Sequence, residues 1–338
     1  DEFGTSVAIT DDGSIILVGT PNTEDIVKMT APGPSQDSTR SFARGQNIIG
    51  GDTGATGTVM RYEEGPTEDV FYVKVTSGTN FDDSTLNAND SSSVSIIDKV
   101  ITDSDRTAQG TVNIITRDTN SQYAISANLV APQIRSGERF GESVAISGDG
   151  EWIAVGAPGG PNDSTLADQG QVYVFKRGVL DSSGLAQYDH WQTLSPNTLS
   201  QVGSRFGEVL SMSGDGSTIA VGVKLYDDST LADQGIVFVW KKSGETYIEV
   251  ENLRQDNAQA NTKFGTSIQL GTDGTDLLIG APRETVTQPN EGTVYHYVNQ
   301  TSTHTGDGST TAFVPTFTVE KYTRLYVSTG TNNWAFDD

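Results

Sequence analysis

The sequence predicts an all-β protein built from small four-stranded antiparallel sheets that recur along the chain. A pattern that begins with Phe-Gly and ends with Gly-x-Pro returns several times, and alternating apolar and polar residues follow each start. The 338 residues include 37 glycines but only 34% hydrophobic residues. Alternation indicates half-buried strands, and abundant glycine favours many tight turns over long helices.

Four copies of the pattern are recognisable, with starts near residues 3, 140, 206 and 264. The residues that define them are Phe3, Gly4, Phe140, Gly141, Gly156, Phe206, Gly207, Phe264, Gly265 and Gly280. The last three copies are spaced by 66 and 58 residues (206 − 140 and 264 − 206). A repeat of this size buries its apolar face only against its neighbours, so the copies are expected to pack side by side.

The second copy shows the four expected strands most clearly. Residues 143–147 and 152–157 form an alternating pair around Asp149-Gly150, and the third and fourth strands are expected at 171–176 and 190–194. Asp-Gly predicts a type I′ hairpin turn, in which both central residues take positive φ. The later copies match element by element, so each repeat is expected to form one antiparallel sheet.

These residues resemble FG-GAP repeats, the blade motif of the integrin α-subunit propeller and of many bacterial and viral surface proteins. The pairs Phe140-Gly141 with Gly156-Ala-Pro158 and Phe264-Gly265 with Gly280-Ala-Pro282 carry the resemblance. The first copy has Gly-Thr-Pro instead, and the third loses the motif after Gly222. The resemblance implies a β-propeller of at least four blades, whose total number stays open because such rings usually resemble seven-bladed integrin propellers.

One interval is about twice as long as the others, because the first two copies lie 137 residues apart (140 − 3). Either a degenerate blade starts near Phe81, or the first blade carries an insertion. The insertion is preferred, since residues 109–115 and 123–129 fit the third and fourth strands of the first blade. The predicted boundaries are 1–40 and 98–302 for the propeller and 41–97 for an inserted β module.

Two segments resemble a different group of proteins. Residues 54–62, which read Gly-Ala-Thr-Gly-Thr-Val-Met-Arg-Tyr, and the strand at 71–78 resemble small β modules of tailed-phage virion proteins. Residues 303–338, with Gly-Asp-Gly-Ser-Thr-Thr at 306–311, resemble the start of another phage tail or fibre module. A decorated loop is the alternative for 41–97. Together the two resemblances imply a virion protein.

Charge and composition exclude several classes of partner. The formal net charge of −23 disfavours binding to a nucleic-acid backbone, which requires a basic surface. It is typical of a protein that stays soluble in a salty or extracellular setting. No apolar segment approaches the ~18 residues of a membrane span. The absence of cysteine excludes thiolate chemistry, and a start at Asp1 without Met suggests a segment of a longer protein.

Calcium is the one cofactor that the acidic loops suggest. It needs about six to eight oxygen ligands, usually from several carboxylates around a bend. The turns at 10–13, 148–150, 214–216 and 272–274 hold one or two carboxylates each, so they are expected to be plain hairpin turns. Two longer loops supply the candidate ligands Asp163, Asp168, Asp228 and Asp233. Duplication of the repeat also explains their similarity, and both explanations stay open.

No catalytic residue is assigned. The chain has three histidines, His190, His296 and His304. No nucleophile elbow, phosphate loop or nucleotide fingerprint accompanies them. Trp152, Trp191 and Trp240 fall at strand positions of successive blades and are expected to pack between blades. A sugar- or peptide-binding platform is the alternative for these tryptophans.

The combined interpretation is a non-enzymatic structural protein of a phage virion, from the tail, a fibre or the baseplate. Its propeller would present loops for assembly with other virion proteins or for attachment to a host-surface glycan or protein, within a multi-subunit assembly. The alternative is an extracellular bacterial adhesin with an integrin-like propeller. A polysaccharide-active enzyme is a further alternative.

Overall fold

A computed structural model describes most of the chain, and every regular element in it is a β-strand. The described residues are 1–32, 45–51, 54–63, 68–77, 85–88, 93–95, 98–100, 107–160, 168–180, 186–196, 201–228, 230–255, 259–285, 289–299, 319–326 and 335–336. Within these ranges there are 24 strands, and no helix is available to cross a membrane. The predicted all-β class is confirmed.

Four antiparallel sheets follow one another along the chain, and we call them blades 1 to 4. Blade 1 contains β1 (Val7–Ile9), β2 (Ile15–Thr20), β10 (Thr111–Arg117) and β11 (Tyr123–Leu129). Blade 2 contains β12 (Ser143–Ile146), β13 (Trp152–Ala157), β14 (Gln171–Leu180) and β15 (Ala186–Leu194). Blade 3 contains β16 (Val209–Met212), β17 (Thr218–Val223), β18 (Ile236–Ser243) and β19 (Thr246–Leu253). Blade 4 begins with β20 (Ser267–Leu270), β21 (Asp276–Ala281) and β22 (Thr293–Asn299).

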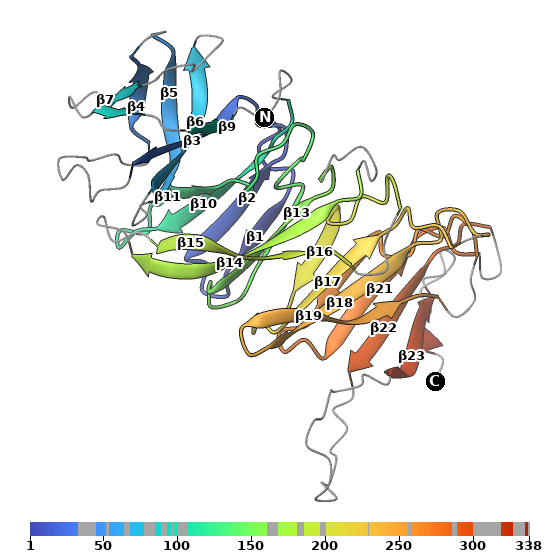
Figure 1. Cartoon of the computed structure of the whole chain (residues 1–338). Helices are drawn as coiled ribbons and strands as arrows, with labels where there is room; N and C mark the ends of the chain where they lie inside the picture. Colours follow the sequence, from blue (N-terminus) through green and yellow to red (C-terminus); the bar gives the residue numbers. More distant parts are fainter. Residues whose placement is uncertain are drawn as a thin grey trace, which may run out of the picture.

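The blades pack face to face in chain order (Figure 1). The first strands β1, β12, β16 and β20 are successive neighbours, while the fourth strands lie at the outer edges. This is how four-stranded blades surround the axis of a propeller. Blades 1 and 4 lie at opposite ends of the array (Figure 1).

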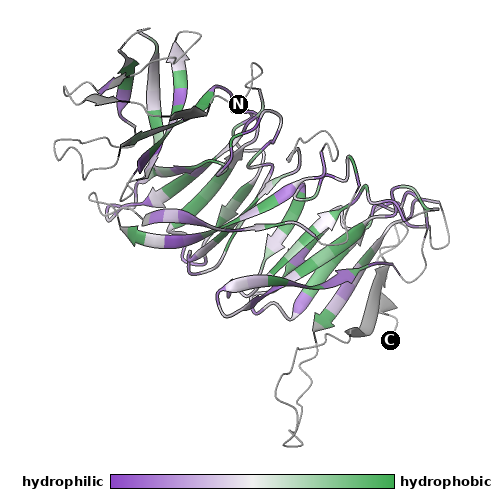
Figure 2. Cartoon of the chain, in the orientation of Figure 1, coloured by the Kyte–Doolittle hydropathy of each residue, from purple (hydrophilic) through white to green (hydrophobic). Residues whose placement is uncertain are grey.

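Hydrophobic residues are concentrated in the strands of the blades (Figure 2). Their buried side chains form one apolar cluster between each pair of neighbouring blades. Between blades 2 and 3, for example, Ala154 and Val174 belong to the same buried cluster as Ile219 and Phe238. Every residue of β13 and β17 is buried, because both faces of these middle blades are covered. Burial of such side chains is worth about 1.5–3 kcal/mol each, so blade-to-blade packing is the main source of stability.

The insertion after β2 forms its own seven-stranded sheet, with the order β8-β7-β4-β5-β6-β3-β9. Its strands are β3 (Ile26–Pro32), β4 (Asn47–Gly50), β5 (Thr56–Glu63), β6 (Glu68–Ser77), β7 (Thr85–Ala88), β8 (Ser93–Ser95) and β9 (Asp98–Val100). A separate core of nine buried residues, which includes Met29 and Phe71, holds it together. The sheet stands beside the outer end of blade 1 (Figure 1).

The predicted boundaries of the insertion, 41–97, are too narrow. The inserted sheet already includes β3 and still includes β9, so residues 26–32 and 98–100 belong to it rather than to the propeller. The apolar segment at 26–32 follows directly on β2, but it pairs with β6 because β10 occupies the edge of β2. The third and fourth strands of blade 1 lie at β10 and β11, as the insertion hypothesis requires.

The predicted separate module at 303–338 is also corrected. β23 (Val319–Tyr326) pairs with β22 as the fourth strand of blade 4, and β24 (Ala335–Phe336) adds a fifth. A blade of three strands would leave the outer edge of β22 unpaired, and β23 supplies the missing hydrogen bonds. Residues 300–318, 327–334 and 337–338 lie outside the described residues.

The hairpin turns of the blades are not type I′. In blade 2, Gly150 has a φ of 71° while Asp149 keeps a negative φ, and Gly150 N donates to Ser147 O at 2.9 Å. Asp149 Oδ1 accepts hydrogen bonds from Ser147 Oγ at 2.6 Å and from Glu151 N at 2.9 Å. These local bonds hold the aspartate in the ordinary conformation, so only the glycine needs the left-handed one. Gly13, Gly216 and Gly274 take the same role.

The Phe-Gly pair of each later repeat forms a corner that sits on the preceding blade. In blade 2, Arg139 N donates to Ala108 O at 2.9 Å and Phe140 N donates to Gln109 O at 3.1 Å. We call Arg139-Phe140-Gly141 and its counterparts the corner, and the preceding blade's acceptor loop the socket. The same bonds run from Phe206 N to Gln169 O and from Phe264 N to Gln234 O. Phe140, Phe206 and Phe264 are completely buried.

The glycine of the Gly-x-Pro motif completes the socket. A Cβ on Gly19 would lie 2.0 Å from Gly141 O, which no real side chain tolerates. The matching distances are 1.9 Å from Gly156 to Gly207 O and 2.2 Å from Gly222 to Gly265 O. The Phe-Gly and Gly-x-Pro signatures are therefore two sides of one contact between successive blades, which we call the blade joint.

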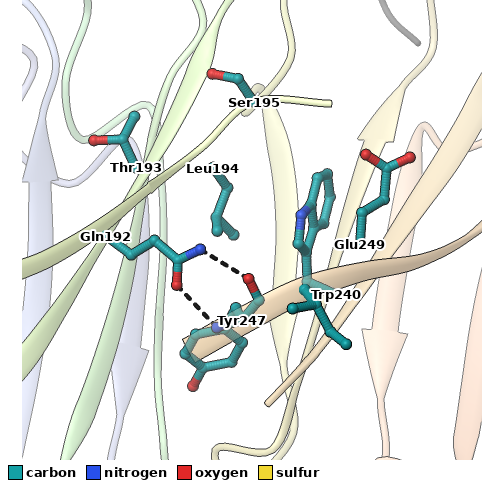
Figure 3. Close-up of a pocket in the computed structure, with 8 residues that line it drawn as sticks. Gln192, Thr193, Leu194, Ser195, Trp240, Tyr247 and Glu249 are labelled. Atoms are coloured by element: carbon teal, nitrogen blue, oxygen red, sulfur yellow. Dashed lines mark hydrogen bonds between the residues drawn. The ribbon is translucent and has the colours of Figure 1, made fainter. Parts of the chain in front are cut away.

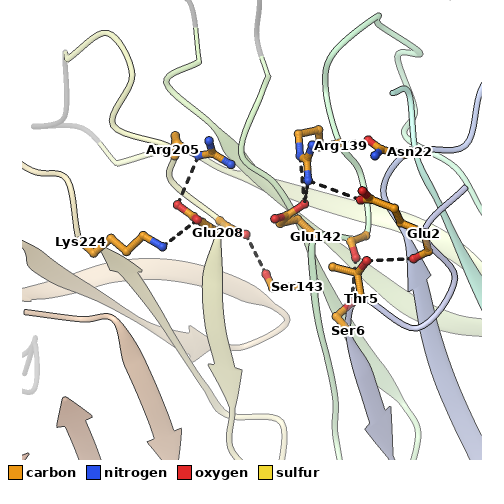
Figure 4. A network of polar contacts seen from close by, with 12 residues as sticks. Glu2, Thr5, Ser6, Asn22, Arg139, Glu142, Ser143, Arg205, Glu208 and Lys224 are labelled. Carbon is orange, nitrogen blue, oxygen red and sulfur yellow. Dashed lines mark hydrogen bonds and ion pairs between the residues drawn. The ribbon is translucent and has the colours of Figure 1, made fainter. Parts of the chain in front are cut away.

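Ion pairs run along the same edge of the blades (Figure 4). Arg139 Nη2 lies 2.7 Å from Glu142 Oε2, and Lys224 Nζ lies 2.8 Å from Glu208 Oε1. These pairs are partly exposed, and surface pairs contribute about 0–1 kcal/mol. Ser143 Oγ donates to Gly207 O at 2.7 Å across the next joint. The joint thus depends mainly on backbone contact and buried rings, with charges as a surface addition.

Substitution of Gly156 by alanine tests the blade joint. The added methyl group would meet Gly207 O, so we expect Gly156→Ala to lower the free energy of unfolding by about 2–4 kcal/mol. Urea unfolding followed by tryptophan fluorescence measures this change. Gly271→Ala is the control, because its Cβ would make an ordinary 3.4 Å contact with Asp276. Equal losses in the two variants would contradict the steric role of Gly156.

Candidate functional site

Two of the four calcium candidates are socket residues. Asp168 O accepts a hydrogen bond from Arg205 N at 3.0 Å, and Asp233 O accepts one from Lys263 N at 3.1 Å. Both aspartates are left-handed, with φ values of 53° and 50°. Asp tolerates this conformation better than most side chains. Their repetition therefore follows from their place in the blade joint.

The carboxylates of blade 3 contact cations of the protein. Asp228 Oδ2 lies 2.8 Å from Arg254 Nη1, and Asp233 Oδ2 lies 3.9 Å from Lys263 Nζ. Asp163 lies outside the described residues. Where the chain is described, no three His, Asp or Glu side chains gather closely enough to hold a metal ion. The structure thus separates Asp168 in blade 2 from Asp228 and Asp233 in blade 3, and calcium binding stays a prediction.

The hairpin aspartates use their carboxylates inside the turns. Asp12 Oδ1 accepts hydrogen bonds from Ser14 N at 2.8 Å and from Thr10 Oγ1 at 2.9 Å. Hydrogen bonds from Ser14 and Thr10 lower the pKa of Asp12 to about 2. The pKa of Asp273 is lowered in the same way by Thr275. These contacts support the prediction that the turns are structural.

A pocket of about 330 Å³ opens between the outer strands of blades 2 and 3 (Figure 3). Its lining residues are Gln192, Thr193, Leu194, Ser195, Trp240, Tyr247, Ile248 and Glu249. Gln192 Nε2 donates to Tyr247 O at 2.8 Å, and Tyr247 N donates to Gln192 Oε1 at 2.9 Å. The amide thus ties β15 to β19, and hydroxyl, amide and carboxylate groups line the opening. Such a lining suits a small polar ligand better than an apolar one.

The tryptophans divide between packing and bridging. Trp152 and Trp240 are each 3% exposed and belong to the core between blades 2 and 3, which confirms the packing prediction for both. Trp152 lies edge-on to Tyr247, with ring centroids 5.6 Å apart. Trp191 is 42% exposed, and its Nε1 donates to Glu245 O of blade 3 at 2.6 Å. It bridges the outer edges of two blades instead of lying between them.

The two histidines that the structure describes contact side chains of neighbouring strands. His190 lies edge-on to Tyr173 and Phe175, each at 5.9 Å, and its Nε2 shares a hydrogen bond with Thr193 Oγ1 at 3.0 Å. Burial lowers the pKa of His190. His296 Nε2 lies 2.6 Å from Asp276 Oδ1 on the open face of blade 4.

One titratable group that the sequence did not single out is buried in the first blade joint. Glu138 precedes the corner of blade 2, is fully buried, and accepts a hydrogen bond from Tyr173 Oη. Burial raises the pKa of the Glu138 carboxyl to about 7, although the bond from Tyr173 opposes this. Ser204 and Thr262 hold the matching positions before the later corners and are also buried. The signal in the sequence was an acidic residue inside the chain at a position where the third and fourth copies carry a hydroxyl.

Glu138 makes stability depend on pH. Its carboxyl binds a proton more tightly in the folded state than in the unfolded state, so the contribution of Glu138 to stability is fully present below about pH 4.5 and is lost as the pH rises through about 7. The loss is at most roughly 3 kcal/mol. Urea unfolding between pH 4.5 and 8 measures it. We expect Glu138→Gln to reduce the dependence of the unfolding free energy on pH, while the control Glu151→Gln, in a hairpin turn, keeps it. An unchanged pH dependence in Glu138→Gln would show that Glu138 is not its source.

Two substitutions at Asp233 separate a structural role from a metal role. We expect Asp233→Asn to stay within about 0.5 kcal/mol of the parent, because asparagine tolerates positive φ. Asp233→Val should lose about 1–3 kcal/mol. Thermal unfolding of each variant, with calcium and with a chelator, measures both the loss of stability and the effect of the metal. A rise in melting temperature with calcium that Asp233→Asn abolishes would establish the carboxylate as a metal ligand.

Residues 125–175, which include the second corner, match the FG-GAP repeat family. No curated protein sequence matches the chain. Among solved structures, the chain is similar to the periplasmic gluconolactonase PpgL of Pseudomonas aeruginosa, with 13% identity, a TM-score of 0.36, and coverage of 88% of this chain and 81% of that one. It is also similar to Sqt1 of Chaetomium thermophilum, with 11% identity, a TM-score of 0.35, and coverage of 87% of this chain and 68% of that one. A third similar structure is KlHsv2 with loop 6CD replaced by a Gly-Ser linker, with 12% identity, a TM-score of 0.30, and coverage of 88% of this chain and 93% of that one.

Similarities as low as those to the solved structures carry no argument about activity. The sheet topology, the repeated blade joint and the family match agree with one another and establish the architecture. The chain is an all-β protein of four-stranded antiparallel β-propeller blades that contains an FG-GAP repeat.

Proposed function

We propose that the chain is a non-enzymatic structural protein of a phage virion, in which the blades form a rigid mount for the inserted sheet. The observation that carries this proposal is that the inserted sheet has a core of its own and is fastened to blade 1 at its base. A module built in this way is suited to contact a partner without disturbing the propeller. Its resemblance to small β modules of tailed-phage proteins supports the virion setting.

The fastening is specific and buried. Gln109 Nε2 donates to Ile26 O at 3.1 Å, and Ile26 N donates to Gln109 Oε1 at 2.7 Å. Ile26 and Tyr72 of the module pack with Val130 and Ile134, which follow β11. A side-chain amide that pairs with backbone in this way is costly to break, because both partners would be left buried without hydrogen bonds. The module is therefore held in one orientation.

The blades suit the role of a mount. Each joint couples two backbones directly, and a buried apolar core lies between each pair of successive blades. Loops and modules that bind partners are commonly placed on such rigid scaffolds. The net charge of −23 favours partners with neutral or basic surfaces over other acidic chains.

Removal of the module tests the proposal in the phage itself. The ends of the insertion are adjacent, since Gln109 N and Gly110 N both donate to Thr23 O, at 3.0 and 3.1 Å. A short Gly-Ser linker can therefore replace residues 26–106. We expect the parent protein to be present in purified particles by mass spectrometry, and particles with the shortened protein to lose assembly or adsorption to host cells.

Two controls accompany this experiment. Circular dichroism of the purified shortened protein checks that the blades still fold. Particles with Val179→Glu, a change at a side chain 84% exposed on blade 2, control for an unrelated change of the protein surface. Absence of the parent protein from particles would refute the virion role. Its recovery from the surface of bacterial cells would favour the adhesin alternative.

A further inference from the structure

The two ends of the blade array carry the two unused halves of a blade joint. Phe3-Gly4 of blade 1 has the sequence of a corner, but Phe3 is 61% exposed, whereas Phe140, Phe206 and Phe264 are completely buried. Among the described residues, no atom lies within 4 Å of a Cβ built on Gly4. The corner at the start of blade 1 is thus formed and unoccupied.

The backbone of this corner already has the conformation used in the joints. Glu2 and Gly4 have φ values of 54° and 94°, and Arg139 and Gly141 of the occupied corner have 57° and 94°. A left-handed conformation is unfavourable for a residue such as glutamate. Its presence at Glu2 means that no rearrangement is needed before the corner docks.

Blade 4 carries the complementary socket. Asn290 and Gly292 have φ values of 58° and 80°, close to the 50° and 84° of Asp233 and Gly235 in the occupied socket of blade 3. Gly280 stands where Gly156 receives the next corner in blade 2. In blades 1 to 3 a Cβ on this glycine would meet the carbonyl of the following corner, but on Gly280 its nearest neighbour is Ser267 Oγ, at 2.3 Å.

Ser267 adds a hydrogen-bonding group to the socket. In blade 1, Ser6 Oγ donates to Gly141 O at 2.8 Å, and in blade 2, Ser143 Oγ donates to Gly207 O at 2.7 Å. Ser267 occupies the same position in blade 4 and is exposed. It is therefore placed to donate to the carbonyl of an incoming Gly4.

The faces beside the corner and the socket are apolar and open. On blade 1, Val7 and Ile9 are 68% and 57% exposed, while their counterparts Val144 and Ile146 in blade 2 are each 8% exposed against blade 1. On blade 4, Leu278 is 43% exposed, and its counterpart Ala220 in blade 3 is completely buried against blade 4. Each open face continues an interface that the chain already forms three times.

We propose that a second copy of this chain fills these positions, so that the corner of blade 1 in one copy docks in the socket of blade 4 in the next. The contact is heterologous, because two different surfaces meet, and it generates a closed ring or a head-to-tail filament. Since both surfaces belong to the same chain, each copy supplies the occupant that the other needs. The proposal does not depend on a role in the virion.

Salt should strengthen this association. Each copy has a net charge of −23, so two copies repel at low ionic strength. The joint itself is apolar and rests on backbone contacts, which salt screens little. We therefore expect larger species as salt rises, whereas an association held by ion pairs would weaken.

Sedimentation velocity of the full-length protein tests the proposal through complementation. Val7→Glu places a charge on the apolar face beside the corner and leaves the socket intact. Leu278→Glu places a charge on the apolar face beside the socket and leaves the corner intact. We expect the parent protein to form dimers or larger species at micromolar concentration, and each variant alone to dissociate with at least about a tenfold higher Kd. An equimolar mixture of the two variants should recover a dimer, because it contains one intact corner and one intact socket.

Val179→Glu is the matched control, since it adds the same charge at an exposed position away from both ends. It should associate like the parent. A parent protein that sediments only as a monomer would overturn the proposal. Further blades of the same protein that cover both the corner of blade 1 and the socket of blade 4 would also overturn it. A mixture of Val7→Glu and Leu278→Glu that stays monomeric while the parent associates would also overturn it.

Discussion

The close approach of two backbones at each blade joint is the constraint on which the rest of this structure depends. The carbonyls of Gly141, Gly207 and Gly265 lie within about 2 Å of the positions that side chains on the preceding glycines would occupy. This contact brings each corner phenylalanine into the core of its joint. The apolar faces of the joined blades meet in buried clusters beside it.

The joint explains features that would otherwise suggest chemistry. Asp168 and Asp233 recur at a socket position that has a positive φ, which Asp tolerates, and that offers a carbonyl to the next corner; Ala108 holds this position in blade 1. The hairpin aspartates recur because each carboxylate closes its own turn. Glu138 stands out against this background, since it is a carboxyl at a buried joint position where blades 3 and 4 have a hydroxyl. The joint between blades 1 and 2 is therefore expected to weaken as the pH rises from about 4.5 to about 7.

The same constraint accommodates a large insertion. The chain leaves blade 1 at Thr23 and returns at Gln109, whose backbone N donates to Thr23 O. The two ends of the inserted sheet are therefore adjacent and joined by a hydrogen bond. Gln109 serves both sides, because its carbonyl accepts from Phe140 N in the joint while its side chain pairs with Ile26 in the module. Movement of the module would thus be coupled to the joint between blades 1 and 2.

The sequence by itself determined the class of fold, the number of recognisable repeats and the first three strands of each blade. It could do so because alternation, glycine spacing and the Phe-Gly pair are local patterns that recur in register. It misjudged the limits of the insertion, since whether residues 26–32 pair with β10 or with β6 is decided by strands far away in the chain. It also assigned residues 319–326 to a separate module, although the open edge of β22 recruits them. Only the tertiary structure decided that the Phe-Gly pair of one repeat meets the Gly-x-Pro glycine of the preceding one, and that Phe3 and Gly280 remain unoccupied. The reason is physical: a local pattern specifies the shape of a surface, but the surface that it meets is set by the packing of the whole chain.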